Sequence, residues 1–555
     1  MKVIVIIPAR GGSKGIPRKN LRLLNKKPLI WYPINIAKRS IYNPDIVVST
    51  DDTEIGEVAY LFGARKLKRP KDLAADDVTL DPVVYHAVVE MERRKHIKYD
   101  LVVTLQPTAP LLKAETLDKA ILFMINNSYD TILSVERSPH LYWKQENGVF
   151  VPLYKRRENR QFLNPLYKEN GAFVISKRNI LTSKSRIGNN VYLFEVPKEE
   201  SIDIDSYSDW WIAENYLSRM NIIFRVDGDT NIGLGHVYRA LTLASRIGLK
   251  HNILFLMDRQ KTLGIRKVKE FNYPVATFKD SGDMFLRMRE FNADIIINDI
   301  LDTEKQYISR LKKENYFVVN FEDMGEGSEV ADLVINALYE NSNPPTNHYY
   351  GYKYVCLRDD FLLYRKKNIS RNVKRILVVF GGTDPNNLTM KTLRAIEKLG
   401  LKEISFRVIL GMGYNFEKEL KKYVHSLLQK GFKISVKKNV KTMAKEISKA
   451  DIVITSNGRT IYEIASLGIP CISIAQNERE SKHLFVHYSK AVEYLGMAYN
   501  INEGKIALAI QSLIKDFALR KIMHKKLLSF ELQEGTERVV RLILNEYFRW
   551  KEKKS

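Results

Sequence analysis

The chain has 555 residues, of which 45% are hydrophobic and 28% are charged, and it contains two cysteines. This length predicts several domains of about 100–200 residues each, and the composition argues against a disordered chain. Two cysteines, Cys356 and Cys471, are too few for a disulfide-stabilised secreted scaffold. No apolar run approaches the roughly 18 residues of a membrane-spanning helix, and no secretion signal follows Met1. We therefore expect a cytoplasmic protein without a membrane partner.

The formal net charge of +25 raises the question of a nucleic-acid partner. Lysine and arginine are, however, spread along the whole chain and are not gathered into one block. The short basic clusters at 93–95 and 551–554 lack the interleaved aromatic residues that are typical of single-strand binders. We therefore interpret the charge as solvated surface lysine and expect no nucleic-acid partner.

Short β-branched runs alternate with helix-length amphipathic segments from end to end, which is the pattern of parallel α/β sheets. A fresh strand and a glycine-rich turn follow residue 221, and a second such restart follows the polar stretch 366–374. These breaks predict three domains, at 1–219, 220–368 and 369–555. The predicted strands lie near residues 3–7, 46–50, 101–105, 131–135, 222–226, 252–257, 294–298, 316–320, 375–380, 405–410 and 451–455.

The first strand runs into a glycine-rich loop at residues 8–20 that carries four cationic side chains. Glycines let backbone amides approach phosphate oxygens, and Arg10, Lys14 and Lys19 supply positive charge for a triphosphate. The spacing is not that of a Walker loop. A plain tight turn is the alternative interpretation of this loop taken alone.

Further polar groups follow other predicted strands of this domain. The strand at 47–50 ends in two aspartates, and the strand at 101–105 is followed by Gln106. Ligands of open α/β sheets gather at such carboxyl ends. Asp203 and Asp205 alternate along the chain, so that both would share one face of an extended segment and suit Mg²⁺. The alternative is a polar strand edge or a helix N-cap before Tyr207.

With these motifs in order, residues 1–217 resemble the CMP-sialic acid synthetase family, the acylneuraminate cytidylyltransferases. The resemblance implies transfer of CMP from CTP to a sialic-acid-like nonulosonic acid with release of pyrophosphate, and related synthetases pair as dimers, which implies a homodimer. Phe173 and Val174 depart from the family and leave the sugar acid open, with pseudaminic acid favoured. The matching pieces are Ala9 to Asn20, Lys27 to Leu29, Val48 to Asp52, Arg69-Pro70, Leu105 to Pro110, Asn170 to Ala172 and Ile202 to Asp205.

The same resemblance assigns roles to individual residues. Arg10, Ser13, Lys14, Lys19 and Asn20 would hold CTP, with Lys14 and Lys19 acting on the pyrophosphate that leaves. Gln106 would contact the sugar acid, and Arg160 would face the sugar or a phosphate. Asp203 and Asp205 would be the Mg²⁺ ligands.

In the second half, a strand at 222–226 leads through a glycine-rich turn to His236 at the start of a helix. The helix dipole there favours the neutral imidazole that a general base requires. A surface or capping histidine is the alternative. A later strand ends in the turn Gly381-Gly382-Thr383, which suits a diphosphate, and residues 455–463 open a further helix.

Residues 221–545 resemble the UDP-sugar hydrolase of pseudaminic acid synthesis, a relative of MurG-type glycosyltransferases. The resemblance implies that His236 activates water, that Gly381, Gly382 and Thr383 meet the diphosphate, and that Glu463 contacts the uridine ribose of a UDP-linked diacetamido-trideoxy hexose. No metal is expected in this half. Arg459 departs from the family pattern by replacing a glycine. A glycosyltransferase and a catalytically silent nucleotide-sugar-binding module are the alternatives.

We therefore expect an α/β protein in which an N-terminal Rossmann-like nucleotidyltransferase (GT-A-like) domain is fused to a GT-B-like pair of Rossmann-like domains.

Overall fold

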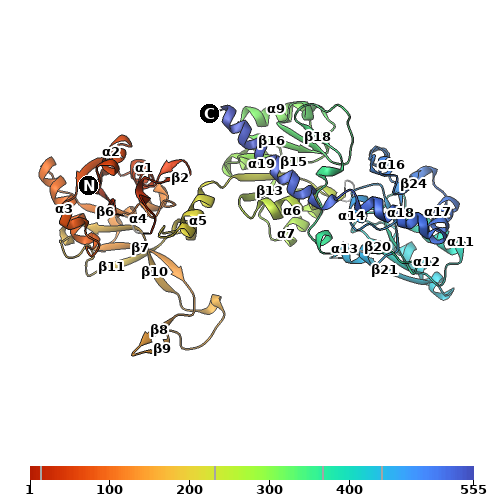
Figure 1. The fold of residues 1–555 in the computed structure, drawn as a ribbon, viewed down its shortest axis with the longest axis horizontal. Helices are drawn as coiled ribbons and strands as arrows, with labels where there is room; N and C mark the ends of the chain where they lie inside the picture. The colour runs from red at the N-terminus through yellow and green to blue at the C-terminus, as the bar shows by residue number, and fades with distance from the viewer. Residues whose placement is uncertain (13–14, 230–232, 365–367, 439, 441, 555) are drawn as a thin grey trace. The chain divides into compact units, whose positions relative to one another are not determined.

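The chain divides between Arg219 and Met220 into two units. The computed structural model describes residues 1–12, 15–229, 233–364, 368–438, 440 and 442–554. Unit 1 is built on one seven-stranded sheet, and unit 2 on a seven-stranded and a six-stranded sheet (Figure 1). Every strand predicted from the sequence is present, and most of the strand ends lie within about one residue of the predicted ends. The predicted boundary between residues 368 and 369 lies in the connection between the two sheets of unit 2.

The sheet of unit 1 has the strand order β11-β7-β10-β6-β1-β4-β5. Its interior strand β1, which lies between β6 and β4, is buried along its whole length, as its β-branched sequence requires. The prediction of a parallel sheet is wrong for β10, which runs antiparallel to both β6 and β7. The strands are β1 (Val3–Pro8), β4 (Asp45–Thr50), β5 (Arg65–Lys68), β6 (Leu101–Leu105), β7 (Thr131–Ser138), β10 (Leu166–Lys177) and β11 (Val191–Glu195).

Helices cover both faces of this sheet, and two of them have caps that fix where they begin. Asp52 caps α2 by accepting a hydrogen bond from the amide of Ile55, and Ser206 and Asp209 form a capping box on α5. Helix α5 packs against the short hairpin of β2 (Leu23–Leu24) and β3 (Lys27–Pro28) through a cluster that includes Ile204 and Trp210. The helices are α1 (Trp31–Arg39), α2 (Thr53–Leu61), α3 (Leu80–Lys95), α4 (Ala114–Asn126) and α5 (Tyr207–Leu217).

An arm projects from unit 1 between β7 and β10, and it ends in the hairpin of β8 (Trp143–Glu146) and β9 (Val149–Pro152) (Figure 1). The sequence analysis missed this hairpin, because its strands are short and have no buried face. Next to the arm, the pairing of β10 with β7 changes register between Glu169 and Val174. We call residues 139–165 the arm.

The first subdomain of unit 2 has a fully parallel sheet in the order β14-β13-β12-β15-β16-β17-β18. In chain order this is 3-2-1-4-5-6-7, the doubly wound arrangement of Rossmann-like folds. Its strands are β12 (Asn221–Val226), β13 (Asn252–Asp258), β14 (Val275–Phe278), β15 (Ile295–Asp299), β16 (Phe317–Phe321), β17 (Leu333–Asn336) and β18 (His348–Tyr350), and its helices are α6 (Gly235–Ile247), α7 (Thr262–Glu270), α8 (Ser281–Glu290) and α9 (Lys305–Lys313).

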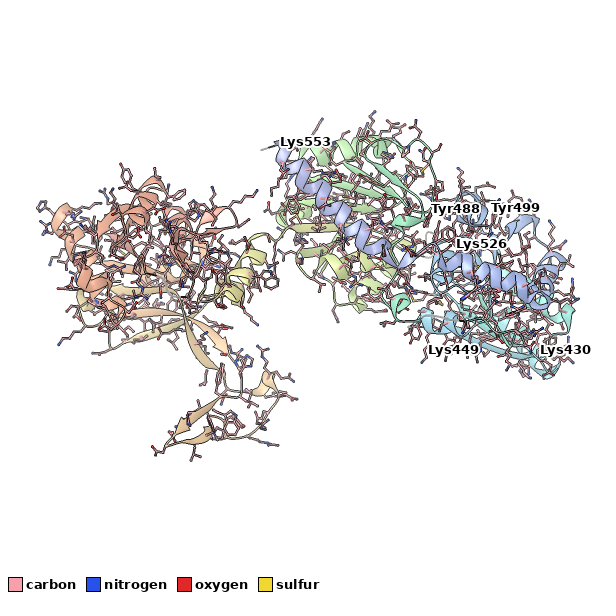
Figure 2. The ribbon with its side chains drawn as sticks, in the orientation of Figure 1. Lys430, Lys449, Tyr488, Tyr499, Lys526 and Lys553 are labelled. Atoms are coloured by element: carbon pink, nitrogen blue, oxygen red, sulfur yellow. The ribbon has the colours of Figure 1, made fainter. Side chains whose placement is uncertain are left out.

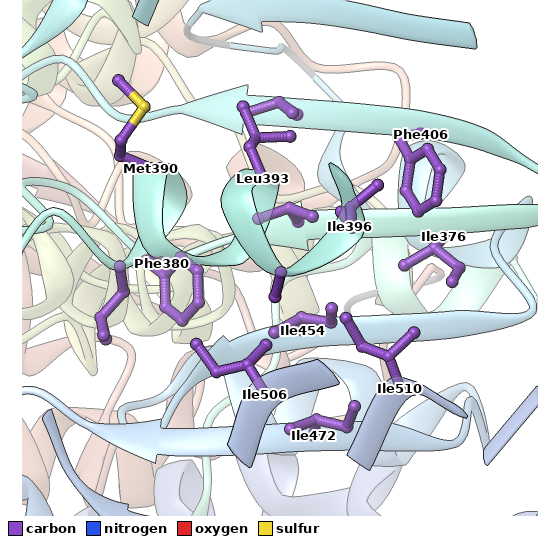
Figure 3. Packing of buried hydrophobic residues seen from close by; sticks show 14 of the residues in the cluster. Ile376, Phe380, Met390, Leu393, Ile396, Phe406, Ile454, Ile472, Ile506 and Ile510 are labelled. Carbon is purple, nitrogen blue, oxygen red and sulfur yellow. The ribbon is translucent and has the colours of Figure 1, made fainter. Parts of the chain in front are cut away.

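The second subdomain repeats the arrangement, with the parallel order β21-β20-β19-β22-β23-β24. Isoleucines and phenylalanines of β19, β20 and β22 pack under helices α11 and α17 in its core (Figure 3). The strands are β19 (Arg375–Val379), β20 (Ser405–Leu410), β21 (Lys433–Lys438), β22 (Ile452–Ser456), β23 (Cys471–Ala475) and β24 (Glu493–Met497).

Short helices follow the strands of this subdomain, and the final helix, α19, returns to the first subdomain (Figure 1). Val539, Ile543 and Tyr547 of α19 are buried in the same core as β12 and α6. The helices are α10 (Asp360–Leu363) in the connection and then α11 (Leu388–Leu399), α12 (Glu417–Gln429), α13 (Met443–Ser448), α14 (Thr460–Ser466), α15 (Glu478–Ser481), α16 (Phe485–Ser489), α17 (Glu503–Lys515), α18 (Phe517–Leu528) and α19 (Gly535–Lys554).

The basic residues of unit 2 lie on several of its elements. Figure 2 labels Lys430, Lys449, Lys526 and Lys553, which are all exposed and which follow or belong to four different helices. Among the described residues, no helix combines the length and the hydropathy that a membrane span requires.

Candidate functional sites

Each large sheet has one point where the strand order reverses, and the residues after the flanking strands meet there. In unit 1 this point lies between β1 and β6, which are followed by the glycine-rich loop and by Gln106. In the first subdomain of unit 2 it lies between β12, which leads to His236, and β15, which ends at Asp299. In the second subdomain it lies between β19 and β22. The topology therefore brings most of the predicted residues to three such points.

The loop after β1 is held from the strand beside it. The amide of Gly11 donates to Oδ1 of Asp51 (3.1 Å), and a methyl group at Gly11 would lie 2.9 Å from Oδ2 of Asp52. Buried Asn20 closes the loop by donating from Nδ2 to the carbonyl oxygen of Arg10 (3.0 Å). The Arg10 guanidinium is partly exposed and pairs with Asp76. The backbone of Arg10 and Gly11 is thus held by the side chains of Asn20 and Asp51, and the cationic side chain of Arg10 is left partly at the surface.

Lys19 joins this loop to the acidic segment far along the chain. Its ammonium group donates to the carbonyl oxygen of Ile204 (2.7 Å) and lies 3.4 Å from Oδ1 of Asp205. The side chain of Lys19 is mostly buried, whereas that of Asp205 is exposed. The segment 201–205 is not a strand, so Asp203 and Asp205 do not share a sheet face. They are nevertheless both brought to the loop.

Gln106 and Asp203 approach each other at Gly171. A methyl group at Gly171 would lie 2.9 Å from Nε2 of Gln106 and 3.7 Å from Oδ2 of Asp203, and the φ angle of Gly171 is +67°. The register change in β10 that spans Gly171 produces this bend. Burial raises the pKa of Asp203 above its usual range, and the nearby charge of Asp205 adds to that effect while a hydrogen bond from Thr108 opposes it.

In unit 2, His236 is the second residue of α6 and forms a pair with Asp299. Nδ1 of His236 lies 2.5 Å from Oδ1 of Asp299, whose side chain is buried. Burial alone would raise the pKa of Asp299, but the positive charge of Arg239, together with His236, outweighs it and holds that pKa well below the usual range. A carboxylate accepts hydrogen bonds only, so this contact places a proton on Nδ1, and in the neutral imidazole Nε2 is then the acceptor.

Arg239 extends this pair into a buried network. It donates to both carboxylate oxygens of Asp299 (Nε 2.7 Å, Nη2 2.6 Å) and from Nη1 to Glu322 (2.8 Å). Glu322 follows β16 and is buried with a φ angle of +51°, which is uncommon for a residue other than glycine. Residues in such sparsely populated backbone conformations cluster at functional sites, and the Glu322 carboxylate accepts a hydrogen bond from Arg239 here.

The turn after β19 packs against the loop that follows β20. Gly381 has a φ angle of +77°, and the carbonyl oxygen of Gly382 accepts a hydrogen bond from the amide of Gly413 (3.0 Å). A methyl group at Gly411 would lie 2.2 Å from that same carbonyl oxygen. A methyl group at Gly382 would lie 4.0 Å from Cα of Gly233, so the glycine turns of the two subdomains face each other. Thr383 is half-buried in this turn.

Glu463, on α14, has an arginine partner in the structure. Its carboxylate lies 3.4 Å from Nη2 of Arg358, which also lies over the ring of Tyr238 on α6. Burial raises the pKa of Glu463, while the charges of Arg358 and Arg459 oppose this. The predicted contact of Glu463 with a ribose stays a prediction.

Comparisons with known proteins agree with this division of the chain. Residues 4–211 match the family described as Cytidylyltransferase, and residues 376–541 match the Glycosyltransferase family 28 C-terminal domain. The CMP-N,N'-diacetyllegionaminic acid synthase of Legionella pneumophila is 35% identical over 235 residues, which cover 39% of this chain and 97% of that protein. The chain belongs to the cytidylyltransferase family.

Two further similarities reach beyond the cytidylyltransferase unit. An uncharacterized protein of Methanocaldococcus jannaschii is 32% identical over 276 residues, which cover 47% of this chain. The alignment covers 56% of that relative, so the chain spans only about half of its length. The crystal structure of Acinetobacter baumannii MurG covers 58% of this chain and 99% of its own, with 17% identity and a TM-score of 0.44.

The predicted metal site of the cytidylyltransferase can be tested on its donor atoms. Oδ1 of Asp203 is buried and has no hydrogen-bond partner among the described residues. No group of three or more acidic, histidine or cysteine side chains suited to a metal occurs in the described part of the chain. Mg²⁺ commonly takes one or two carboxylates and completes its shell with substrate phosphates and water. Asp203 and Asp205 therefore fit Mg²⁺ that arrives with a nucleotide.

Some predicted residues are not joined to these sites. Ser13 and Lys14 lie outside the described residues. Arg160 is exposed on the arm, in the 3-10 helix Arg160–Phe162. Conversely, Arg69 is buried and donates to the carbonyl oxygen of Ser49 (2.7 Å), so it supports the strand end beside the loop of the cytidylyltransferase.

The sequence analysis missed Asp299 and Glu322. The signal for Asp299 was available, because it ends an apolar run whose carboxyl end meets the same edge of the sheet as His236. Glu322 carries no such signal beyond its place after β16.

Proposed function

We propose that this chain is a bifunctional enzyme of nonulosonic acid synthesis. Unit 1 transfers CMP from CTP to a sialic-acid-like sugar acid and releases pyrophosphate, with pseudaminic acid as the favoured acceptor. Unit 2 hydrolyses a UDP-linked diacetamido-trideoxy hexose to the free sugar and UDP. The name of the Legionella relative supports a nonulosonic acid as the acceptor class.

The first activity is carried by the approach of Asp205 to Lys19 of the glycine-rich loop. In the reaction, the anomeric hydroxyl of the sugar acid attacks the α-phosphorus of CTP, and the bond to the bridging oxygen of pyrophosphate breaks. Lys19 and Arg10 would stabilise the charge that develops on pyrophosphate, and Gln106 would orient the sugar acid beside Gly171. Mg²⁺ bound at Asp203 and Asp205 would neutralise phosphate charge and polarise the α-phosphate.

The second activity is carried by the hydrogen bond between His236 and buried Asp299. Nε2 of His236 would take a proton from water as its oxygen attacks the anomeric carbon, and the bond to UDP would break with its electron pair on the diphosphate. The amides of the Gly381-Gly382 turn would bind that diphosphate. Asp299 would keep the imidazole in the tautomer that accepts a proton and would stabilise the imidazolium that forms.

A second candidate is transfer of the sugar to an organic acceptor in place of water. The match of residues 376–541 to glycosyltransferase family 28 favours this reading. Release of UDP in the absence of any acceptor separates the two candidates.

The experiment is two assays on the full chain. Pyrophosphate release is measured with Mg²⁺, each nucleoside triphosphate, and N-acetylneuraminic, legionaminic or pseudaminic acid, and UDP release is measured with UDP-sugars alone. Asp205→Asn should abolish the first activity and spare the second, and His236→Ala should do the reverse. Silence with every acid would refute the assignment of unit 1. Wild-type UDP release by His236→Ala would refute the role of His236.

We further propose that the protein forms a homodimer through the arm. Large apolar side chains are exposed there, among them Trp143, Val149, Phe150 and Phe162. Exposed apolar patches of this kind mark interaction surfaces. Sedimentation should show a dimer for the wild-type chain and a monomer for Phe150→Asp, and a monomeric wild type would contradict the proposal.

A further inference from the structure

Arg459 crosses from the second subdomain of unit 2 to the first. It follows β22 and immediately precedes α14, and its Nη1 donates to the carbonyl oxygen of Gly235 (2.7 Å). Its Nη2 donates to the carbonyl oxygen of Cys356 (3.0 Å). Gly235 is the first residue of α6 and directly precedes His236. The guanidinium therefore holds the turn that carries the candidate base.

Ion pairing does not account for the arginine at position 459. Burial lowers its pKa to about 10, and the positive charge of Arg239 contributes to that shift. No carboxylate among the described residues lies within ion-pair distance of its guanidinium, although Asp299 and Glu463 act on it from farther away. A half-buried arginine that donates only to neutral carbonyls gains little stability for the desolvation that it costs. The planar guanidinium of Arg459 donates to two carbonyl oxygens at once, and its effect is to place the first turn of α6, which begins at Gly235.

A second arginine makes a parallel contact. Nη2 of Arg479, on α15, donates to the carbonyl oxygen of Glu322 (2.6 Å), and Arg479 also pairs with Asp302. The Glu322 carboxylate accepts a hydrogen bond from Arg239. Arg239 also donates to Asp299, which forms the hydrogen bond with His236. Arg459 and Arg479 of the second subdomain thus both donate to backbone carbonyl oxygens beside the network around His236.

We propose that Arg459 is a positioning residue of the hydrolytic site, which places His236 only while the two subdomains of unit 2 are together. This inference rests on the proposed hydrolysis. It assigns Arg459 to the first turn of α6 and not to the diphosphate of the substrate. Because Arg459 reaches α6 from the other subdomain, His236 is placed to act as a base only when the glycine turns of both subdomains face each other.

The test compares Arg459→Ala and Arg459→Lys with Arg407→Ala, which removes from β20 in the same subdomain an arginine that pairs with Glu446. Four quantities are measured on the full chain: kcat and KM for UDP release, the affinity for UDP by calorimetry, and hydrogen exchange of α6. Arg459→Ala should lower kcat about 100-fold, as expected for a displaced catalytic group. Its affinity for UDP should stay within about twofold of wild type, and exchange in the first turns of α6 should accelerate.

Arg459→Lys should recover part of kcat, because a single ammonium group can donate to the carbonyls without fixing their geometry. Arg407→Ala should match wild type in all four quantities. A loss of UDP affinity with unchanged α6 exchange would overturn the proposal and make Arg459 a diphosphate ligand. Unchanged kcat and exchange would also overturn it. If the wild-type chain releases no UDP, the proposed hydrolysis fails, while the exchange of α6 in Arg459→Ala still decides whether Arg459 holds that turn.

Discussion

Replacement of Asp299 by asparagine tests the central element of unit 2. Asp299 accepts three hydrogen bonds, two from Arg239 and one from Nδ1 of His236. Asparagine keeps the volume but has one acceptor oxygen and brings a donor group against other donors. The variant therefore leaves the charge of Arg239 with Glu322 as its one remaining carboxylate. Its amide nitrogen also turns a donor toward Arg239 or toward Nδ1 of His236, which weakens the contact that keeps the proton on Nδ1.

The size of both effects can be worked from these contacts. Hydrogen bonds to charged groups contribute about 1.5–3 kcal/mol each, and breaking a buried ion pair costs about 3–5 kcal/mol. Because Arg239 keeps Glu322, we expect the lower end, a loss of about 3 kcal/mol in the free energy of unfolding. General-base catalysis contributes about 10²–10⁴-fold, and we expect UDP release to fall within that range.

The pH dependence has a definite sign. The pKa of Asp299 is depressed in the folded protein, so its contribution to stability is present above the unfolded pKa of about 4 and is lost as the pH falls toward the folded value. The stability gap between wild type and Asp299→Asn should therefore be full at neutral pH and shrink on acidification below about pH 4.

Urea unfolding and UDP release provide the measurements, and pyrophosphate release by unit 1 serves as an internal control for an intact chain. Glu270→Gln is the matched control, because it removes an exposed carboxylate from a pair with Lys267 in the same subdomain and should cost less than about 1 kcal/mol. Unchanged UDP release by a folded Asp299→Asn protein would refute the role given to this hydrogen bond.

Three further substitutions test other parts of the sites. Asp203→Asn should abolish Mg²⁺-dependent pyrophosphate release and leave UDP release unchanged, since Asp203 supplies a buried unpaired carboxylate oxygen. Glu480 lies on α15 and accepts a hydrogen bond from the amide of Gln476 (2.8 Å), and burial raises its pKa to about 7. Because the folded state then binds the extra proton, wild-type stability should fall as the pH rises from about 4.5 to 7, and Glu480→Gln should be up to about 3 kcal/mol more stable than wild type at pH 8 in urea titrations. Gly411→Ala should weaken UDP binding in calorimetry, because its methyl group would lie 2.2 Å from the Gly382 carbonyl oxygen.

The sequence predicted the elements that depend on local pattern. The buried strands were found because they are β-branched runs, and the turn at Gly235 and the turn at Gly381 were found because glycines follow such strands. His236 was placed correctly at the start of α6 for the same reason.

The partners of these residues were not predictable in the same way. Asp299 lies 63 positions from His236, and Lys19 lies 185 positions from Ile204, so their contacts arise from the order of strands in each sheet and not from spacing along the chain. The hairpin of the arm carries no periodic apolar signal, because its strands are almost wholly exposed. The antiparallel direction of β10 follows from its pairing with β6 and β7 and not from its residue pattern. The strain at Glu322 follows from the backbone and cannot be read from a residue type.

The two units use charge in different ways, and this difference follows from where the charges lie. In unit 1 the Arg10 guanidinium is partly exposed while the Asn20 side chain holds the Arg10 carbonyl oxygen, which suits the capture and release of a highly charged nucleotide. In unit 2, Arg239 and Asp299 are almost fully buried and satisfy each other, so they cannot serve as ligands for a passing anion. Their position instead fixes one imidazole. The arrangement in unit 1 supports chemistry that depends on neutralising phosphate, and the arrangement in unit 2 supports chemistry that depends on a correctly oriented base.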